Sequence, residues 1–233
     1  MKYFWASLLL LVLFAPVMSQ DVYVPNRYKQ DEYAIHFGFC LGLNVMNFKV
    51  TPNIASAQND SMVANVSTAT PGFNIQIISN YRLGEYFDLR FLPGIAFGQR
   101  SLDFYKNNTL VNSDHRLESN FLEFPLLLKY KAKRKVNMRP YVITGVNCRV
   151  DLAHNYNEDQ KIYLQLKRFD YYLEAGSGID FYLEFFKLSV ELKFSYGFNN
   201  MLNPRTPPLG KDSYQNSIAR IGSTLTMLSF HFE

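Results

Sequence analysis

Histidine and acidic side chains are the residues of this sequence most able to do chemistry, because they transfer protons and bind metals. Two histidines lie near aspartate, in "NSDHR" and "DLAHNYNED". A loop histidine beside aspartate is usually solvated, a mixed loop cluster of possible metal ligands is common by chance, and no glycine-rich loop has phosphate-binding spacing. We therefore expect no enzyme, no metal site and no cofactor, the candidates being His36, His115, His154, Glu158, Asp159 and His231.

A second set of charged residues recurs on one side of alternating polar and apolar segments. Acids and bases occur there in similar numbers, so the chemistry they predict is ion pairing rather than a reaction. An unpaired buried ion is expensive, whereas a hydrogen-bonded pair is tolerated. We expect a network that fills and rigidifies the interior, formed by Asp88, Glu123, Glu174, Asp180, Glu191, Arg82, Arg90, Lys129, Arg149, Lys187 and Lys193.

The elements that position these charges are strands, because apolar side chains recur at every second residue. "YAIHFGFCLGLNVMNF" sets large apolar residues such as Phe37 and Phe39 against small or polar ones such as Gly38 and Cys40. The pattern recurs seven times, in segments longer than the ~5–6 residues usual for soluble strands. The eight predicted strands are 33–48, 72–82, 86–100, 121–131, 139–152, 169–183, 186–198 and 221–232.

The connections between these strands alternate in length. Short turns are expected around 82–85, 132–137 and 183–186, and long polar loops at 51–70, 101–116, 151–167 and 199–216. Short turns at one rim, long loops at the other and an even number of strands are typical of outer-membrane barrels. This pattern predicts extracellular long loops and periplasmic termini.

The start of the sequence and its bulk composition narrow the class further. "MKYFWASLLLLVLFAPVMS" places Lys2 before a short apolar run, as in a secretory signal peptide. We expect a signal peptide at 1–19, then a single barrel domain at 20–233 with a short N-terminal periplasmic tail. The formal net charge is +4 with interspersed signs, so nucleic acid is not an expected partner. Cys40 and Cys148 fall on opposite faces of distant strands and are expected to be free thiols.

Two environments fit such an alternating barrel. A soluble lipocalin-like barrel would turn its apolar face inward around a ligand. Here the apolar face carries Phe, Tyr, Leu and Ile, too much volume for the interior of eight strands, whereas the other face is rich in Gly, Ser and Asn. The sequence therefore predicts an all-β protein, an eight-stranded antiparallel up-and-down transmembrane β-barrel of the outer membrane with an occluded lumen.

The sixth and seventh strands predict a specific register. If the turn closes at Leu183 and Glu184, Asp180 stands opposite Lys187, and Glu174 opposite Lys193. Two pairs of opposite charge from one register support that register.

A resemblance to a known family adds an expectation about function. "ESNFLEFPLLLKYKAKRKVNMRPYVITGVN", "DYYLEAGSGIDFYLEFFKLSVELKFSYGFNN" and "FGFCLGLNVMNFKV" resemble segments of the PorT family, called SprT in gliding bacteria. The resemblance implies a non-enzymatic outer-membrane barrel of the Bacteroidetes type IX secretion system, needed for protein secretion and, where present, gliding motility. It implies contact with other type IX components, above all the large translocon barrel of the Sov/SprA type, and with outer-membrane lipid and lipopolysaccharide. The alternative is a stand-alone, OmpX-like surface barrel with an adhesive or structural role.

Two short segments are candidate docking surfaces for such partners. The turn "KAKRKVN" groups four bases, whose simpler role is a solvated turn beside lipid phosphates and whose sharper role is to dock an acidic periplasmic component. The loop "NPRTPPLG" is stiffened by its prolines, which suits a preformed contact. The candidate docking residues are Lys131, Lys133, Arg134, Lys135, Pro204, Pro207 and Pro208.

Overall fold

The computed structural model describes residues 26, 33–53, 62–66, 70–106, 109–152, 166–202 and 218–233, and consists of strands joined by turns. Among these residues, no helix is long and apolar enough to cross a membrane. The strands are β1 (Ile35–Pro52), β2 (Met62–Val66), β3 (Pro71–Arg82), β4 (Phe87–Phe91), β5 (Gly94–Phe97), β6 (Gln99–Lys106), β7 (Thr109–Glu118), β8 (Phe121–Lys131), β9 (Met138–Asp151), β10 (Phe169–Tyr182), β11 (Lys187–Gly197) and β12 (Ile218–Phe232).

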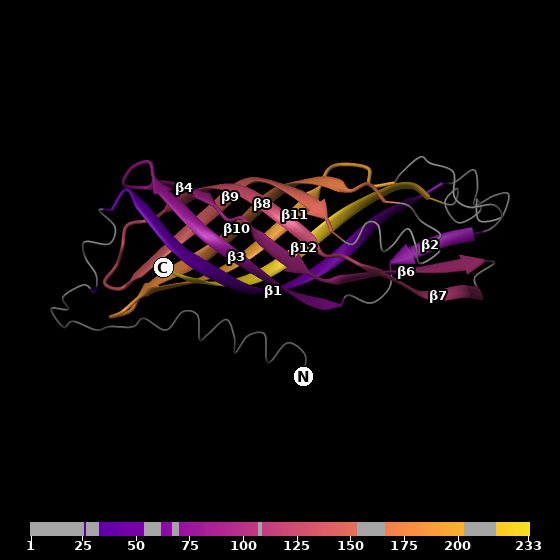
Figure 1. The fold of residues 1–233 in the computed structure, drawn as a ribbon, viewed down its shortest axis with the longest axis horizontal. Helices are drawn as coiled ribbons and strands as arrows, with labels where there is room; N and C mark the ends of the chain where they lie inside the picture. The colour runs from indigo at the N-terminus through magenta and orange to yellow at the C-terminus, as the bar shows by residue number, and fades with distance from the viewer. Residues whose placement is uncertain are drawn as a thin grey trace, which may run out of the picture.

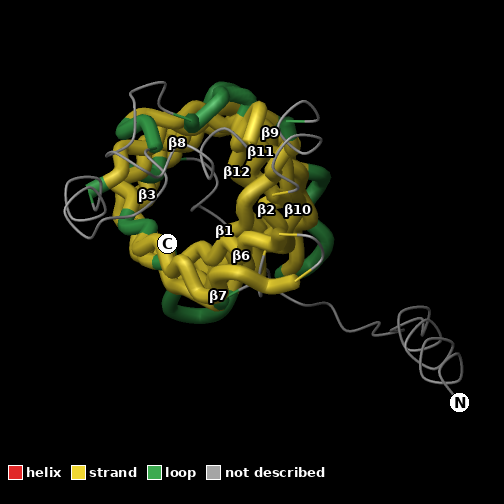
Figure 2. The backbone as a smooth tube through the Cα atoms, turned by 90° about the vertical axis from the view of Figure 1, so that its right-hand side faces the viewer, coloured by secondary structure: helices red, strands yellow, loops and turns green. Residues whose placement is uncertain are grey.

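The main sheet closes on itself as an antiparallel barrel. Its order is β1-β12-β11-β10-β9-β8-β4-β3-β5, with further pairings of β1 with β3 and of β8 with β5. Because β4 and β5 both pair with β3 and β8, they are two parts of one strand, and the ring has eight strands. Figure 1 shows the barrel from the side, and Figure 2 shows the ring along its long axis. The predicted fold class is confirmed.

Leu92 and Pro93 interrupt the third strand of the ring. Proline has no backbone N–H and cannot donate to a ladder. Leu92 N instead donates to Pro125 O at 3.1 Å, and Pro93 O accepts from Ile77 N at 2.9 Å. The interruption therefore leaves these backbone groups paired to both neighbouring strands.

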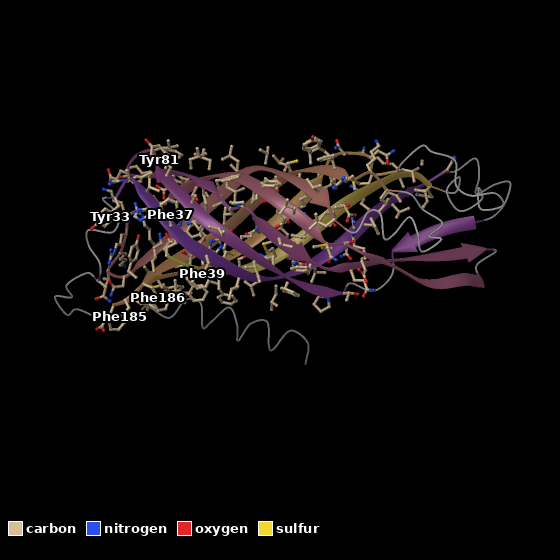
Figure 3. All side chains as sticks on the ribbon, in the orientation of Figure 1. Tyr33, Phe37, Phe39, Tyr81, Phe185 and Phe186 are labelled. Carbon is tan, nitrogen blue, oxygen red and sulfur yellow. The ribbon has the colours of Figure 1, made fainter. Side chains whose placement is uncertain are left out.

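The two faces of the ring divide by size and polarity as expected. Large apolar side chains point outward, for example Phe37 with 69% of its surface exposed. Figure 3 shows Tyr33, Phe37, Phe39 and Tyr81 standing on the outside of the wall. Polar side chains such as Asn80, 1% exposed, point inward. An apolar exterior around a polar interior is stable only where the exterior meets lipid.

Part of the predicted loop region is folded into strands, so that prediction was wrong. Residues 101–106 belong to β6 and residues 109–116 to β7, which pair with each other, and β2 adds a third strand. Figure 1 shows this three-stranded sheet extending beyond one end of the barrel. Because Gln99 pairs with Glu118 directly after the β5–β8 ladder, backbone pairing continues without needing an apolar face.

Both cysteines are free thiols, as predicted. Cys40 is buried in the lumen, whereas Cys148 is half-buried on β9. The structure does not describe residues 1–25, so the predicted signal peptide lies outside it.

Candidate functional site in the barrel lumen

Ten of the predicted lumen charges are buried inside the barrel. Each retains 5% or less of its exposed surface. They alternate with lipid-facing residues along five strands of the ring, β4, β8, β9, β10 and β11, because successive side chains of a strand point to opposite faces. The ten are Asp88, Arg90, Glu123, Lys129, Arg149, Glu174, Asp180, Lys187, Glu191 and Lys193. Arg82 is half-buried at the rim, where its Nε donates to Gly84 O at 3.2 Å.

One group of charges, which we call the Arg90 cluster, lies near the rim formed by the short turns. Arg90 Nη2 is 2.9 Å from Glu233 Oε1, and Arg90 Nη1 is 3.4 Å from Glu191 Oε2. Lys187 Nζ is 2.6 Å from Glu233 Oε2. His231 Nε2 lies 3.6 Å from Glu191 Oε1. The cluster therefore joins β4, β11 and the end of β12 across the lumen.

Two lysines of β8 extend this cluster around the wall. Lys129 Nζ is 2.8 Å from Asp180 Oδ2 and lies 3.7 Å from the centre of the Tyr141 ring. Ser189 Oγ donates to Asp180 Oδ1 at 2.6 Å. Lys131 Nζ is 2.6 Å from Asp88 Oδ1. Each buried carboxylate here meets an ammonium group, which offsets the loss of its hydration.

A second group, the Arg149 cluster, is built by β8 to β11. Arg149 Nε is 2.6 Å from Glu123 Oε1, and the two residues stand directly opposite in the β8–β9 register. Glu174 accepts Arg149 Nη2 at 3.1 Å and Lys193 Nζ at 3.0 Å. Asn147 and Ser195 also donate to Glu174, at 2.9 Å and 2.8 Å. The Glu174 carboxylate thus receives four donors.

Arg100 is buried at the start of β6, toward the end of the barrel from which β6 and β7 extend. Its guanidinium lies 4.2 Å from the centre of the Phe48 ring and 5.1 Å from that of Phe121. It donates to Ser119 Oγ at 2.7 Å and to Ser223 Oγ at 2.8 Å. Aromatic faces attract a cation, and the desolvated site strengthens that attraction.

The ion pairs balance in charge. Among the described residues, the buried lumen pairs join six carboxylates and six Lys or Arg side chains, which makes the network neutral as a unit. A neutral, mutually hydrogen-bonded network is stable as a packed core and has no fixed charge to attract ions. What the arrangement can do chemically is hold the wall rigid and block the lumen.

The register of the β10–β11 hairpin corrects one prediction. Tyr182, not Asp180, stands opposite Lys187, and Asp180 stands opposite Ser189. The turn closes one residue later than expected, because Leu183 N donates to Phe186 O at 3.0 Å around Glu184 and Phe185. The expected pair of Asp180 with Lys187 is therefore wrong. Asp180 binds Lys129 and Lys187 binds Glu233, whereas Glu174 and Lys193 do pair, across a diagonal of the register.

The structure places the four bases of the candidate docking turn in different environments. The prediction that Lys131 is a docking residue was wrong, because its side chain points into the lumen and binds Asp88. Arg134 is half-buried: it donates to Asn26 O, Val136 O and Asn137 Oδ1, and lies 3.7 Å from the Tyr182 ring centre. Lys133 and Lys135 are exposed. Pro204, Pro207 and Pro208 lie outside the described residues.

Sequence reasoning missed several charged residues of the lumen. Glu233 continues the inward parity of Ser229 and His231, and this alternation runs one residue past the predicted end of the strand at Phe232. Arg100, Asp151 and Asp170 follow the same parity in their strands but were not assigned to the lumen network.

The structure describes the side chains of two histidines, His36 and His231. His36 is half-buried and His231 is buried in the Arg90 cluster, 3.3 Å from Arg90 Nη1. The side chains of His115 and His154 lie outside the described part of the chain, as do Glu158 and Asp159. In the residues that are described, no three His, Cys, Asp or Glu side chains are grouped as metal ligands.

Comparison with known proteins places the chain in a family. Solved structures similar to it include Neisserial surface protein A (11% identity, 86% of this chain and 99% of that chain, TM-score 0.43), OprG from Pseudomonas aeruginosa (15%, 85% and 91%, 0.43) and Ail, the attachment invasion locus protein of Yersinia pestis (10%, 84% and 96%, 0.36). No curated protein matches the sequence. The family model described as "Outer membrane protein beta-barrel domain" matches residues 20–203. The chain belongs to this outer-membrane β-barrel family, and the outer membrane is where it resides.

Proposed function

We propose that this protein is a non-enzymatic subunit that assists type IX protein secretion by contact with other components, not by conducting cargo. The observation that carries this proposal is the packed lumen. Arg90, Arg149 and Arg100 are each 2% exposed or less. A barrel of eight strands filled by ion pairs has no room for a polypeptide.

The resemblance of "LEFPLLLKYK" followed by "RPYV" to the PorT/SprT family supports the choice of secretion system. These residues form β8 and the start of β9, which supply Glu123, Lys129 and Lys131 to the lumen network. The same segment thus carries both the family resemblance and the groups that block the lumen.

The contact surface that we propose is the sheet formed by β2, β6 and β7. Strands that continue past the barrel rim hold their backbone in a fixed arrangement, and a sheet edge can accept a strand from a partner. We place this sheet and the long loops on the extracellular side and the short turns in the periplasm, as in other outer-membrane barrels. The partner would be the large translocon barrel.

A trimmed barrel tests the proposal. Residues 101–116 are replaced by Asn-Gly, which joins Arg100 to Leu117, two residues that face each other in the β6–β7 register. Cells carrying this variant, the wild type or a deletion are compared for secretion of cargo with type IX sorting domains and, in gliding strains, for motility. Heat-modifiable migration in gels verifies that the trimmed barrel is folded. We expect both mutants to lose secretion.

The outcomes separate the two candidate functions. Normal secretion in the deletion strain would leave the stand-alone surface barrel as the function, with the same sheet as its adhesive part. Lost secretion in the deletion strain but normal secretion with the trimmed barrel would keep the secretion role and move the contact away from β2, β6 and β7. Pull-down of the translocon barrel by the wild type, but not by the trimmed form, would place the contact on this sheet.

A further inference from the structure

The lipid-facing wall carries a groove near the rim of the short turns. Its volume is about 720 Å³, within the range of small-molecule sites. Its middle is a single row of residues that face each other from β8 to β12. Reading along that row, the residues are Tyr130, Val142, Ser177, Leu192 and Leu228.

The depth of the groove comes from small outward residues among large ones. Ser177 separates Val142 from Leu192, and all three are exposed on the lipid-facing side. Ala132 and Pro140 form the next step toward the rim, where Ala132 N donates to Pro140 O at 3.0 Å. Large side chains such as Phe37 and Phe39 stand on other parts of the wall (Figure 3).

The groove ends where the protein meets the membrane surface. Tyr130 contacts Phe87, with ring centres 5.1 Å apart, and Tyr86, with ring centres 6.4 Å apart. Aromatic side chains with polar tips gather at the level of lipid headgroups. Directly after Ala132, the exposed Lys133 and Lys135 are the two bases of the turn whose side chains reach solvent.

We propose that this groove binds one acyl chain of an anionic phospholipid, whose phosphate sits on Lys133 and Lys135. The occupant follows from the distribution of charge. The groove is lined mainly by apolar residues, and the exposed Lys133 and Lys135 follow its lining residue Ala132 in the adjoining turn, which matches an amphiphile with one anionic head. An extended protein segment in the same groove would leave its backbone N–H and C=O groups unpaired in lipid. An apolar transmembrane helix would satisfy its own backbone but would give Lys133 and Lys135 no anionic partner.

Native mass spectrometry of the whole barrel tests the proposal. The protein is released gently from bilayers that contain equal amounts of phosphatidylglycerol and phosphatidylcholine, and the lipids still bound are counted. The wild type should retain one lipid, mainly phosphatidylglycerol. Ser177→Phe fills the groove and should lose that lipid. Its matched control is Ser79→Phe on β3, on the opposite side of the ring, where Ser79 stands beside Phe37 on the lipid-facing wall; it should behave as the wild type.

The two lysines are tested separately. The double variant Lys133→Gln and Lys135→Gln should keep a lipid but lose the preference for phosphatidylglycerol, by about fivefold for each lysine. Lys167→Gln with Arg168→Gln, a pair of exposed bases outside this turn, is the charge control and should keep the preference. Heat-modifiable migration verifies folding of every variant.

Three results would overturn the inference. The first is equal lipid retention by Ser177→Phe and the wild type. The second is equal binding of the anionic and the zwitterionic lipid by the wild type. The third is a second copy of the chain or another protein bound to the wild type and lost in Ser177→Phe, which would make the groove a protein contact.

Discussion

Arg90 and Glu233 connect two strands that are not neighbours in the barrel. Arg90 Nη2 on β4 lies 2.9 Å from Glu233 Oε1, directly after β12, and both side chains are fully buried. In the closed ring, β1 and β3 separate the two partners on one side, and β8, β9, β10 and β11 separate them on the other. The ion pair therefore crosses the lumen, and Lys187 Nζ at 2.6 Å makes Glu233 a carboxylate shared by two cations.

Replacing Glu233 should destabilise the barrel strongly. Glu233→Gln leaves the buried cations Arg90 and Lys187 without their shared carboxylate, and breaking a buried pair typically costs about 3–5 kcal/mol. The measurement is the free energy of unfolding in urea, in a detergent or bilayer where unfolding is reversible. Glu184→Gln, in the exposed turn before β11, is the matched control and should leave stability nearly unchanged. Equal stability of the two variants would contradict the role assigned to Glu233.

The same carboxylate should make stability depend on pH. Burial alone would raise the pKa of Glu233, but Lys187 and Arg90 outweigh it and hold that pKa well below its ordinary value of 4.5. A group with a lowered pKa stabilises the folded state above its unfolded pKa and loses that contribution as pH falls through the folded pKa. The difference in unfolding free energy between wild type and Glu233→Gln should therefore be largest above pH 4.5 and shrink in more acidic solution. A difference that is constant from neutral to acidic pH would speak against the pair.

Glu174 and Lys193 should be strongly coupled. Lys193 Nζ is 3.0 Å from Glu174 Oε2, and both are buried. Residues in one ion-pair network show interaction energies of about 0.5–3 kcal/mol. A double-mutant cycle with Glu174→Gln and Lys193→Met should be non-additive in that range. Glu174→Gln should be the more harmful single change, because Arg149 also loses one of its two carboxylate partners and keeps only Glu123. Additive losses would remove the pair from the network.

The sequence pattern predicts the ring and its faces well because the protein meets two different environments. Lipid outside and a narrow polar lumen inside impose a period of two on each strand. The predicted segment 121–131 coincides with β8, and the other ring strands differ mostly at their ends. Phe37 and Asn80 fall on the expected sides. The alternation of side chains between the two faces is therefore enough to predict the ring strands and the face on which each side chain lies.

Parity cannot determine which lumen charges meet. Moving the β10–β11 turn by one residue shifts the pairing by two positions and leaves each side chain on its face. The pattern therefore cannot distinguish Lys187 opposite Asp180 from Lys187 opposite Tyr182. In a lumen this narrow the partner can also come from across the barrel, as Glu233 does. Outside the membrane no apolar face is imposed, so β6 and β7 resemble a polar loop.

Crosslinking can verify the observed register directly. Ile179 stands opposite Val190, whereas a turn at Leu183 and Glu184 would place it opposite Leu188. Directly opposite residues bring their Cα atoms within the range that a disulfide needs. In a background with Cys40→Ala and Cys148→Ala, Ile179→Cys with Val190→Cys should crosslink rapidly under mild oxidation. Ile179→Cys with Leu188→Cys should crosslink much more slowly, and the reverse order would restore the turn at Leu183.

The final prediction is that the purified barrel forms no stable channel. Three arginines at different levels of the lumen each lie against a buried aromatic ring: Arg90 is 5.8 Å from the Tyr141 ring centre, Arg149 is 4.1 Å from that of Tyr172, and Arg100 is 4.2 Å from that of Phe48. Opening a path for hydrated ions would require breaking several buried pairs together. In planar bilayers the protein should therefore give no steady current under conditions where a 16-stranded porin conducts. Steady porin-like steps from protein verified as folded by heat-modifiable migration would mean that the lumen is open, and would return conduction to the possible roles of this barrel.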